Sequence, residues 1–160
     1  MELLLGTDLV KISRIQDSLE RFGQRFADRI YTPTEQQDCW RRSPPSTLDP
    51  KSWDPQLIPQ ETLKRFAGRW AAKEAIVKAL GTGWTGVGYT DVAVCRLPSG
   101  EPRPALEGRA LARLRVLDPD GQGVWRLSMT HDGDYAMATA IALILPIPKH
   151  FYPSTAEPSS

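Results

Sequence analysis

The sequence predicts a single α+β domain, and three observations support that fold class. The chain has 160 residues, a length at which one hydrophobic core is usual. Of these residues 41% are hydrophobic and 24% are charged, as in ordinary globular proteins. Segments typical of strands and of helices alternate irregularly, without the strict strand–helix–strand order of a parallel α/β fold. We expect the domain to span residues 1–145, with a Pro/Ser-rich tail over residues 146–160.

The N-terminal part of the domain predicts one strand and two helices. The apolar run Leu3–Val10 is typical of a buried strand and carries Asp8 near its end. Residues 13–16 (Ser-Arg-Ile-Gln) match a capping box, and apolar residues at helical spacing predict one helix to about residue 29. Residues 32–35 (Thr-Pro-Thr-Glu) match a second box with proline at the first helical position, which predicts a short helix to about residue 41.

The remaining chain predicts a long helix followed by mixed strands and helices. Residues 43–59 contain five prolines and are interpreted as a surface excursion of the same domain. A helix over residues 60–80 follows and ends at the Gly81-Thr82-Gly83 turn. Beyond it we expect a strand near residues 91–97, a helix near 109–117, and an antiparallel strand pair over 124–130 and 135–145, joined by residues 131–134.

The charge balance and the cysteine content exclude several classes of function. With 20 Lys and Arg against 19 Asp and Glu, the net charge of +1 gives no general attraction to nucleic acid or anionic lipid, so we expect neither as a partner. Cys39 and Cys95 are too few for a disulfide framework or a four-thiolate zinc site, which favours a cytoplasmic location. The longest apolar stretch, residues 136–145, is shorter than the ~20 residues of a membrane span.

The predicted helix over residues 60–80 carries charges where a simple amphipathic helix has none. At ~100° per residue, Lys73 projects within the apolar stripe and Arg69 flanks it. Glu74 lies at the edge of the stripe beside Lys78. In one interpretation Lys73 extends to solvent while Glu74 and Lys78 form an ion pair. In the other, Glu74 joins a second carboxylate to hold a divalent cation, and the basic residues neutralise phosphates.

Asp8 is the candidate for that second carboxylate. A charged group at the end of a buried strand is costly unless it is hydrogen-bonded, paired or bound to a metal. One interpretation is that Asp8 caps the turn into the first helix. The other is that Asp8 and Glu74 together bind magnesium, which takes one or two carboxylates plus substrate phosphates.

The first predicted helix carries basic residues on one face, about a quarter-turn from its apolar stripe. They are Arg14, Arg21 and Arg25. Such residues often serve only to keep a protein soluble. Their segregation on a nearly neutral chain is also typical of a surface that docks an acidic partner.

Two further features have both a structural and a functional interpretation. The Gly81-Thr82-Gly83 turn is sufficient as a helix stop, and it also permits close approach of the backbone to a ligand. His131 lies in the link between the last two predicted strands, where it is either structural or a donor to a phosphate or base.

Three segments of the chain carry a family resemblance. They are residues 6–10 (Gly-Thr-Asp-Leu-Val) with Arg14-Ile15; residues 66–75 (Phe-Ala-Gly-Arg-Trp-Ala-Ala-Lys-Glu-Ala) continuing through 78–83 (Lys-Ala-Leu-Gly-Thr-Gly); and residues 127–131 (Leu-Ser-Met-Thr-His) with 134–136 (Asp-Tyr-Ala). Together they resemble holo-[acyl-carrier-protein] synthase, the small-subunit class of 4′-phosphopantetheinyl transferases. Residues 100–102 (Gly-Glu-Pro) also resemble the Gly-x-Pro turn of that family. The resemblance covers most of the chain in the family's order.

The resemblance implies a fold, an assembly and an activity. The fold is a long central helix packed on an antiparallel sheet, and three copies form a homotrimer with active sites between neighbouring subunits. The implied reaction, which serves fatty acid synthesis, transfers 4′-phosphopantetheine from coenzyme A to a serine of apo acyl carrier protein. Its products are holo acyl carrier protein and adenosine 3′,5′-bisphosphate.

The resemblance also implies roles for particular positions. Asp8 and Glu74 would hold Mg²⁺ on the coenzyme A diphosphate, and Lys78 would contact the phosphates as the third catalytic residue. The positions that would lie around the nucleotide are Arg69, Gly81, Thr82, Gly83 and His131, and we group Lys73 with them as a phosphate-neutralising cation. The first helix would dock an acidic helix of the carrier through Arg14, Arg21 and Arg25.

The chain departs from the family pattern at several positions. Thr7 and Trp70 replace residues that are commonly aliphatic and Phe, and Asp132-Gly133 replaces a common hydroxyl residue after the histidine. The excursion over residues 43–59 is longer than in compact members.

Two other functions compete with this one. A metal-dependent nuclease is disfavoured because a net charge of +1 gives no broad phosphate-binding surface. A trimeric module that binds carriers without transfer would not need Asp8, Glu74 and Lys78.

Overall fold

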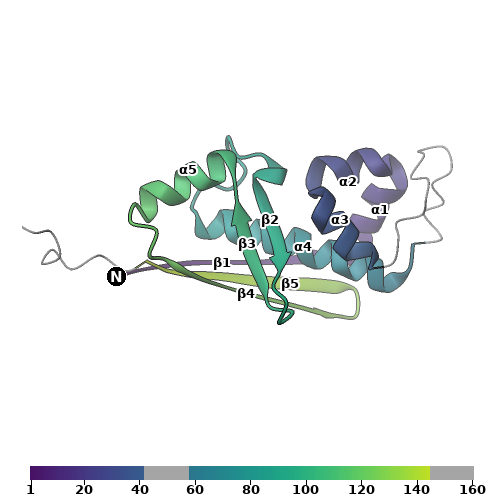
Figure 1. Cartoon of the computed structure of the whole chain (residues 1–160). Coiled ribbons are helices and arrows are strands. Elements are labelled where there is room, and N and C mark those ends of the chain that lie inside the picture. The colour runs from purple at the N-terminus through teal and green to yellow at the C-terminus, as the bar shows by residue number, and fades with distance from the viewer. Residues whose placement is uncertain (42–57, 145–160) are drawn as a thin grey trace, which may run out of the picture.

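The computed structural model describes residues 1–41 and 58–144 (Figure 1). A three-stranded antiparallel sheet lies along one side of the long helix α4 (Gln60–Ala79). Three short helices gather near the start of α4, and a two-stranded sheet and helix α5 (Gly108–Leu117) lie toward its other end. The α+β class and the long helix on an antiparallel sheet, both expected from the sequence, are confirmed. No helix in the described ranges is long and apolar enough to cross a bilayer.

The main sheet has the strand order β1-β5-β4, with all neighbours antiparallel. The strands are β1 (Glu2–Lys11), β4 (Val124–Asp132) and β5 (Tyr135–Ile144). The predicted C-terminal strand pair is confirmed, but its link is shorter than the four residues expected. His131 pairs with Ala136, and Asp132 with Tyr135, so only residues 133 and 134 form the turn, with glycine at a φ of 50°.

Small residues bring the sheet and α4 into close contact. Every second residue of β5 faces the helix, and the first four of these are alanines that are fully buried or nearly so: Ala136, Ala138, Ala140 and Ala142. On β1, a Cβ added to Gly6 would lie 2.0 Å from the carbonyl oxygen of Ala75. Strand β1 therefore contacts the backbone of α4 directly, and this contact positions the residues that follow Gly6.

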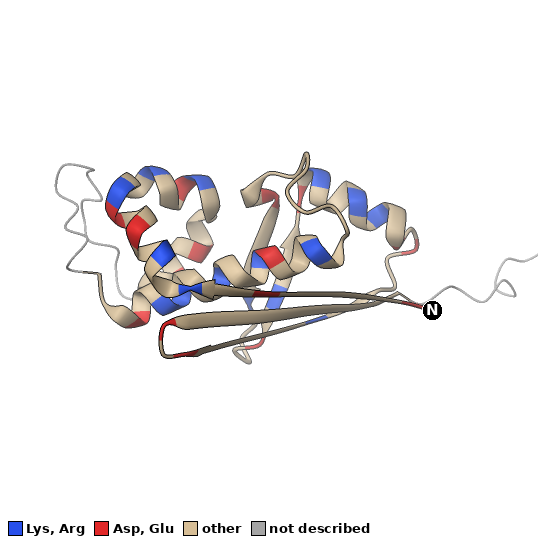
Figure 2. Ribbon diagram, turned by 180° about the vertical axis from the view of Figure 1, so that it is seen from behind, with Lys and Arg blue, Asp and Glu red and all other residues tan. Residues whose placement is uncertain are grey.

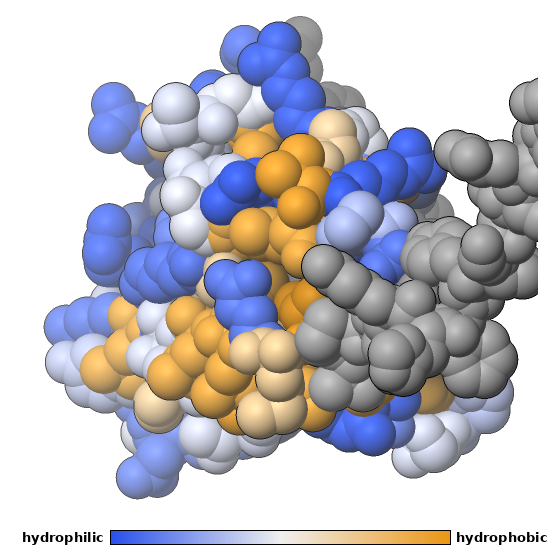
Figure 3. All heavy atoms as spheres, turned by 90° about the vertical axis from the view of Figure 1, so that its left-hand side faces the viewer, coloured by the Kyte–Doolittle hydropathy of each residue, from blue (hydrophilic) through white to orange (hydrophobic). Residues whose placement is uncertain are grey.

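The face of the sheet opposite α4 is apolar and exposed in the single chain. Strand alternation places there the large apolar residues Leu3, Leu5, Leu9, Val124, Tyr135, Met137 and Ile141, each at least 37% exposed. Figure 3, which looks at the end of the molecule where β1 begins, shows apolar residues reaching the surface among hydrophilic ones. An apolar surface of this kind marks an interaction site on most soluble proteins. We call it the open sheet face.

The N-terminal helices differ from the sequence prediction in two ways. Instead of one helix to residue 29, the chain forms α1 (Ile12–Phe22) and α2 (Gln24–Ile30), separated by Gly23 at a φ of 54°. The predicted capping box at residues 13–16 is also wrong, because α1 begins directly after β1 with Lys11 at the N-cap and no side-chain cap. The backbone N–H of Ile12 donates instead to the carbonyl of Asp134 at 2.7 Å.

Helix α3 (Pro33–Trp40) confirms the second capping box. The Thr32 hydroxyl accepts from the Glu35 backbone N–H at 3.3 Å, and the Glu35 carboxylate accepts from the Thr32 N–H at 2.9 Å. The helix ends at Arg41, in the left-handed conformation with a φ of 47°.

The smaller sheet contains a strand that the sequence analysis did not predict. Strand β2 (Val92–Arg96) follows the short 3₁₀ helix η2 (Tyr89–Asp91) and confirms the strand expected near residues 91–97. Its partner β3 (Pro102–Leu106) contains two prolines, which normally argue against a strand. The predicted helix near residues 109–117 is confirmed as α5.

Two sequence predictions fall largely or wholly outside the described ranges. The surface excursion over residues 43–59 is described only at Ile58, which is buried, and at Pro59, the N-cap of α4. The tail over residues 146–160 lies entirely outside.

Candidate active site

Asp8 and Lys78 meet where β1 crosses the second half of α4. The Lys78 Nζ atom lies 2.7 Å from Asp8 Oδ1 and donates a second hydrogen bond to the Thr7 carbonyl at 3.1 Å. Asp8 lies two residues beyond Gly6 on the same face of the strand, so the close contact at Gly6 brings it to the helix. Asp8 does not cap α1, whose N-cap is Lys11. The structure thus brings together two of the three predicted catalytic residues.

Glu74, the third, lies one helical turn before Lys78 on the same side of α4. It is half-buried, and its Oε1 atom accepts a hydrogen bond from the indole N–H of Trp84 at 2.9 Å. The sequence left open an ion pair between Glu74 and Lys78. Within the described residues this pair does not form, and Lys78 pairs with Asp8 instead.

The two carboxylates fit a magnesium ion that is shared with a substrate. Within the described residues, protein hydrogen bonds engage only one oxygen of Asp8 and one of Glu74. Among residues 1–41 and 58–144, no three His, Cys, Asp or Glu residues form a ready cage for a metal. Magnesium binds typically through one or two carboxylates together with waters and substrate phosphates, so this donor set suits it.

The Gly81-Thr82-Gly83 turn ends α4 as predicted. The backbone N–H groups of Thr82 and Gly83 both donate to the Val77 carbonyl, at 3.2 and 3.3 Å. Gly81 and Gly83 have φ values of 72° and 53°, which residues with a Cβ adopt rarely. The turn leads directly into Trp84, the residue that binds Glu74. A contact of this turn with a nucleotide stays a prediction.

The structure contradicts the assignment of Lys73 to a bound nucleotide. Its side chain is 0% exposed, and its Nζ atom lies 2.8 Å from a carboxylate oxygen of Glu35. The same ammonium donates to the carbonyls of Tyr89 at 3.0 Å and Val92 at 2.6 Å. Burial lowers the pKa of Lys73, and the neighbouring Glu35 carboxylate opposes that shift. Lys73 therefore joins α4, α3 and β2 inside the domain, where no phosphate reaches it.

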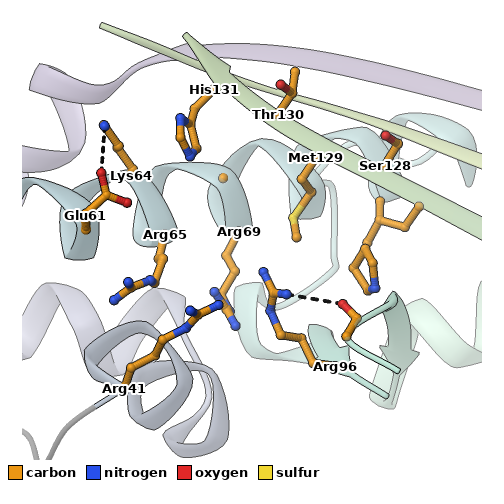
Figure 4. A pocket seen from close by; sticks show the side chains of 14 residues that line it. Arg41, Glu61, Lys64, Arg65, Arg69, Arg96, Ser128, Met129, Thr130 and His131 are labelled. Carbon is orange, nitrogen blue, oxygen red and sulfur yellow. Dashed lines mark hydrogen bonds and ion pairs between the residues drawn. The ribbon is translucent and has the colours of Figure 1, made fainter. Parts of the chain in front are cut away.

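Arg69 and His131 line a cavity of about 440 Å³ at the first half of α4 (Figure 4). The sequence analysis missed four further basic residues that line it: Lys64 and Arg65 on α4 itself, Arg41 at the end of α3 and Arg96 on β2. Arg69 is 1% exposed, donates to Asp38 at 3.1 Å, and has a buried Nε atom with no hydrogen-bond partner among the described residues. A buried donor without a partner is costly, so this cationic cavity is suited to an anion.

The predicted site residues thus fall into two groups along one helix. Arg69 belongs to the cationic cavity, whereas Glu74 and Lys78 lie toward the end of α4 with Asp8. At ~1.5 Å per residue, the nine residues from Arg69 to Lys78 correspond to about 13 Å of helix. In the described part of the chain, the cavity that Arg69 lines contains neither Glu74 nor Lys78.

The predicted docking arginines lie on two helices instead of one. Arg14 and Arg21 are on α1, and Arg25 is on α2 because the chain turns at Gly23; all three are exposed. Figure 2 shows the basic residues on these helices in blue. Next to them is a hollow of about 590 Å³ whose walls combine apolar rings with two arginines: Phe22, Arg25, Phe26, Arg29, Ile30, Trp70 and Tyr89. The sequence analysis did not identify this hollow.

Comparisons with known proteins show which family this chain is similar to. The family model described as "4'-phosphopantetheinyl transferase superfamily" matches residues 4–140. A holo-[acyl-carrier-protein] synthase of Gloeobacter violaceus is 46% identical over 135 residues, which cover 84% of this chain and 88% of the relative. The corresponding protein of Mesorhizobium japonicum is 42% identical over 145 residues, covering 89% and 93%.

Solved structures show the same fold. A holo-[acyl-carrier-protein] synthase from Neisseria meningitidis has a TM-score of 0.61 and 32% identity. The match covers 88% of this chain and 97% of the solved chain. Such a protein from Chronobacterium ammoniagenes, solved as a complex with coenzyme A, has a TM-score of 0.67 and 27% identity. The match covers 91% of this chain and 100% of the solved chain. The resemblance found in the sequence is confirmed. The chain belongs to the 4′-phosphopantetheinyl transferase superfamily.

Proposed function

We propose that this chain transfers 4′-phosphopantetheine from coenzyme A to a serine of apo acyl carrier protein. The observation that carries the proposal is the cluster on the second half of α4, where Asp8 binds Lys78 at 2.7 Å and Glu74 lies one turn away. Two carboxylates beside an ammonium group suit a metal-bound diphosphate. The relatives named holo-[acyl-carrier-protein] synthase and the complex with coenzyme A support the choice of substrates.

In the proposed reaction the serine oxygen attacks the phosphorus that bears the pantetheine. The new P–O bond forms as the P–O bond to adenosine 3′,5′-bisphosphate breaks, and the serine proton leaves to a base. Asp8 and Glu74 would hold Mg²⁺, which when bound neutralises the diphosphate. Lys78 stabilises the negative charge that develops on the leaving bisphosphate. The base is either Glu74 itself or a water that Asp8 or Glu74 orients.

The cationic cavity is the proposed site for the phosphorylated nucleotide end of coenzyme A. Buried Arg69 offers an Nε donor that has no partner among residues 1–41 and 58–144, and His131 and the surrounding basic residues line the same cavity. Arginine recognises phosphate oxygens through its fork of N–H donors, which makes this lining suitable for a phosphate.

We further propose that the chain assembles as a homotrimer through the open sheet face. Large apolar side chains on that face need a partner surface, and a second copy offers the same strands. Assembly would also place the cationic cavity of one copy beside the carboxylates of its neighbour. This supplies the reason why Arg69 and Lys78 lie about 13 Å apart along α4 in each chain.

Leu5→Lys is expected to break this assembly. Leu5 is 57% exposed in the single chain and lies in the middle of β1, opposite Ile141. A lysine there would have to bury its charge in the interface. Size-exclusion chromatography with light scattering should give the mass of three copies for the wild type and of one for the variant at low micromolar concentration. Leu97→Lys, an exposed apolar position outside the main sheet, is the matched control. A variant that keeps the mass of three copies would refute the proposed interface.

The carrier protein is proposed to dock on α1 and α2. The exposed arginines attract an acidic helix, and the adjacent hollow between Phe22 and Trp70 takes an apolar side chain of that helix. Association of this kind weakens as salt screens the charges.

Arg14→Glu is expected to raise the KM for the carrier about tenfold, with little change in the KM for coenzyme A, because charge reversal repels the acidic helix. Steady-state kinetics with each substrate varied in turn measures both constants. Arg115→Glu, the same change at an exposed arginine of α5, should leave both constants unchanged. A rise in the KM for coenzyme A alone would contradict docking at this face.

The proposed reaction is tested directly by intact-mass spectrometry. Apo acyl carrier protein is incubated with this protein, coenzyme A and Mg²⁺, and a gain of one phosphopantetheine is expected. The gain should disappear with a chelator, and with a carrier whose acceptor serine is replaced by alanine. Absence of any gain on several apo carriers, with coenzyme A binding intact, would favour the non-catalytic binding module instead.

A further inference from the structure

Trp84 contacts the carboxylate of Glu74 from outside helix α4. Its indole N–H donates to Glu74 Oε1 at 2.9 Å, the only side chain among the described residues that hydrogen-bonds this carboxylate. Trp84 lies in the turn beyond the end of α4, ten residues after Glu74, and both side chains are half-buried. A neutral donor such as the indole N–H fixes the orientation of a carboxylate without bringing the positive charge of a lysine or an arginine.

The indole ring is itself held on two sides by other rings. Trp70 stacks on Trp84 with ring centroids 6.0 Å apart and an interplanar angle of 16°. Tyr89 packs at 4.6 Å and 55°. Because Trp70 is one helical turn before Glu74, the stack lies along the same side of α4 as the carboxylate. These contacts restrict the indole to the orientation in which its N–H points to Glu74.

We propose that Trp84 is a positioning residue for the metal ligand Glu74. The hydrogen bond occupies Oε1 and fixes the carboxylate plane, so that Oε2 is left for the cation that Glu74 and Asp8 share. The inference rests on the proposed function, because it takes Glu74 as a ligand of Mg²⁺. Donors that orient metal ligands in this way commonly alter metal affinity 10- to 100-fold when they are removed.

Trp84→Phe tests the proposal because it removes the N–H group and keeps an aromatic ring in the stack. Mn²⁺ is titrated into the coenzyme A-saturated protein, and free Mn²⁺ is measured by electron paramagnetic resonance. We expect the affinity for Mn²⁺ to fall about 10- to 100-fold. The Mg²⁺ concentration for half-maximal rate should rise by a similar factor, with most of the rate recovered at saturating Mg²⁺. Tyr89→Phe keeps an aromatic ring at position 89 and leaves the indole N–H of Trp84 in place, so this variant should bind Mn²⁺ like the wild type.

Three outcomes separate the possible failures. If Trp84→Phe binds Mn²⁺ like the wild type while Glu74→Gln does not, the positioning role is overturned and the proposed function stands. If Glu74→Gln also binds Mn²⁺ like the wild type, the metal assignment itself fails. If Trp84→Phe lowers the melting temperature and reduces the rate equally at all Mg²⁺ concentrations, Trp84 is a packing residue and the inference is wrong.

Discussion

Glu74→Gln is expected to reduce the rate of phosphopantetheine transfer by a factor on the order of 10²–10³ or more, while the protein stays folded. The substitution removes one of the two negative charges proposed to hold the cation, and groups that stabilise transition-state charge typically contribute this much. Glutamine keeps the size of the side chain and an oxygen that accepts from the Trp84 indole at the position of Oε1. Folding should therefore change little, because Glu74 is half-buried and makes no ion pair with a described residue.

The measurement is the initial rate of carrier modification, followed by intact mass, with the melting temperature recorded in parallel. Glu107→Gln is the matched control, since Glu107 is an exposed glutamate at the N-cap of α5 whose side chain makes no cap. It should retain the wild-type rate. A Glu74→Gln protein that transfers at the wild-type rate would exclude Glu74 as a metal ligand.

Lys73→Met is expected to lower the free energy of unfolding by about 3–5 kcal/mol, which is the usual effect of removing one partner of a buried ion pair. Glu35 is 1% exposed and would be left as a buried charge without its ammonium partner, 2.8 Å away in the wild type. The carbonyls of Tyr89 and Val92 would also lose their donor. Urea unfolding at a fixed protein concentration measures the change, because assembly makes stability depend on concentration.

The double variant Lys73→Met/Glu35→Gln separates loss of the pair from loss of packing. Glutamine carries no charge, yet it keeps an oxygen for the backbone N–H of Val94, which donates to Glu35 at 2.9 Å. The double variant should therefore be more stable than Lys73→Met alone. Equal stability of the two would mean that the charge on Glu35 is not what destabilises the single variant.

The sequence predicted the parts of the fold whose signals are local. The apolar run of β1, the capping box of α3 and the glycine stop of α4 each depend on residues that lie close together in the chain. The break at Gly23 was missed because apolar spacing continues across it, and only the left-handed φ of 54° separates the two helices. Strand β3 was missed because its prolines argue against a strand, and pairing with β2 outweighs that preference.

The site residues were predicted where a charge was out of place in its own element. Asp8 at the end of an apolar strand and Glu74 at the edge of an apolar stripe are of this kind, and the structure brings both to the same half of α4. Lys73 gave the same signal for a different reason. Its partner Glu35 lies 38 positions earlier in the chain, and periodicity within one helix carries no information about a partner on another. Trp84 and two of the basic residues of the cavity, Arg41 and Arg96, were missed for the same reason, because they lie outside α4.

The division of the site along α4 has a consequence for genetics. A chain that is defective only at the cavity, such as Arg69→Ala, and a chain that is defective only at the carboxylates, such as Glu74→Gln, damage different halves of the helix. If each site is built from two copies, a cell that produces both defective chains forms some assemblies in which the intact half of one copy faces the intact half of another. Two alleles that are each inactive alone would then complement one another, whereas two alleles with defects in the same half would not.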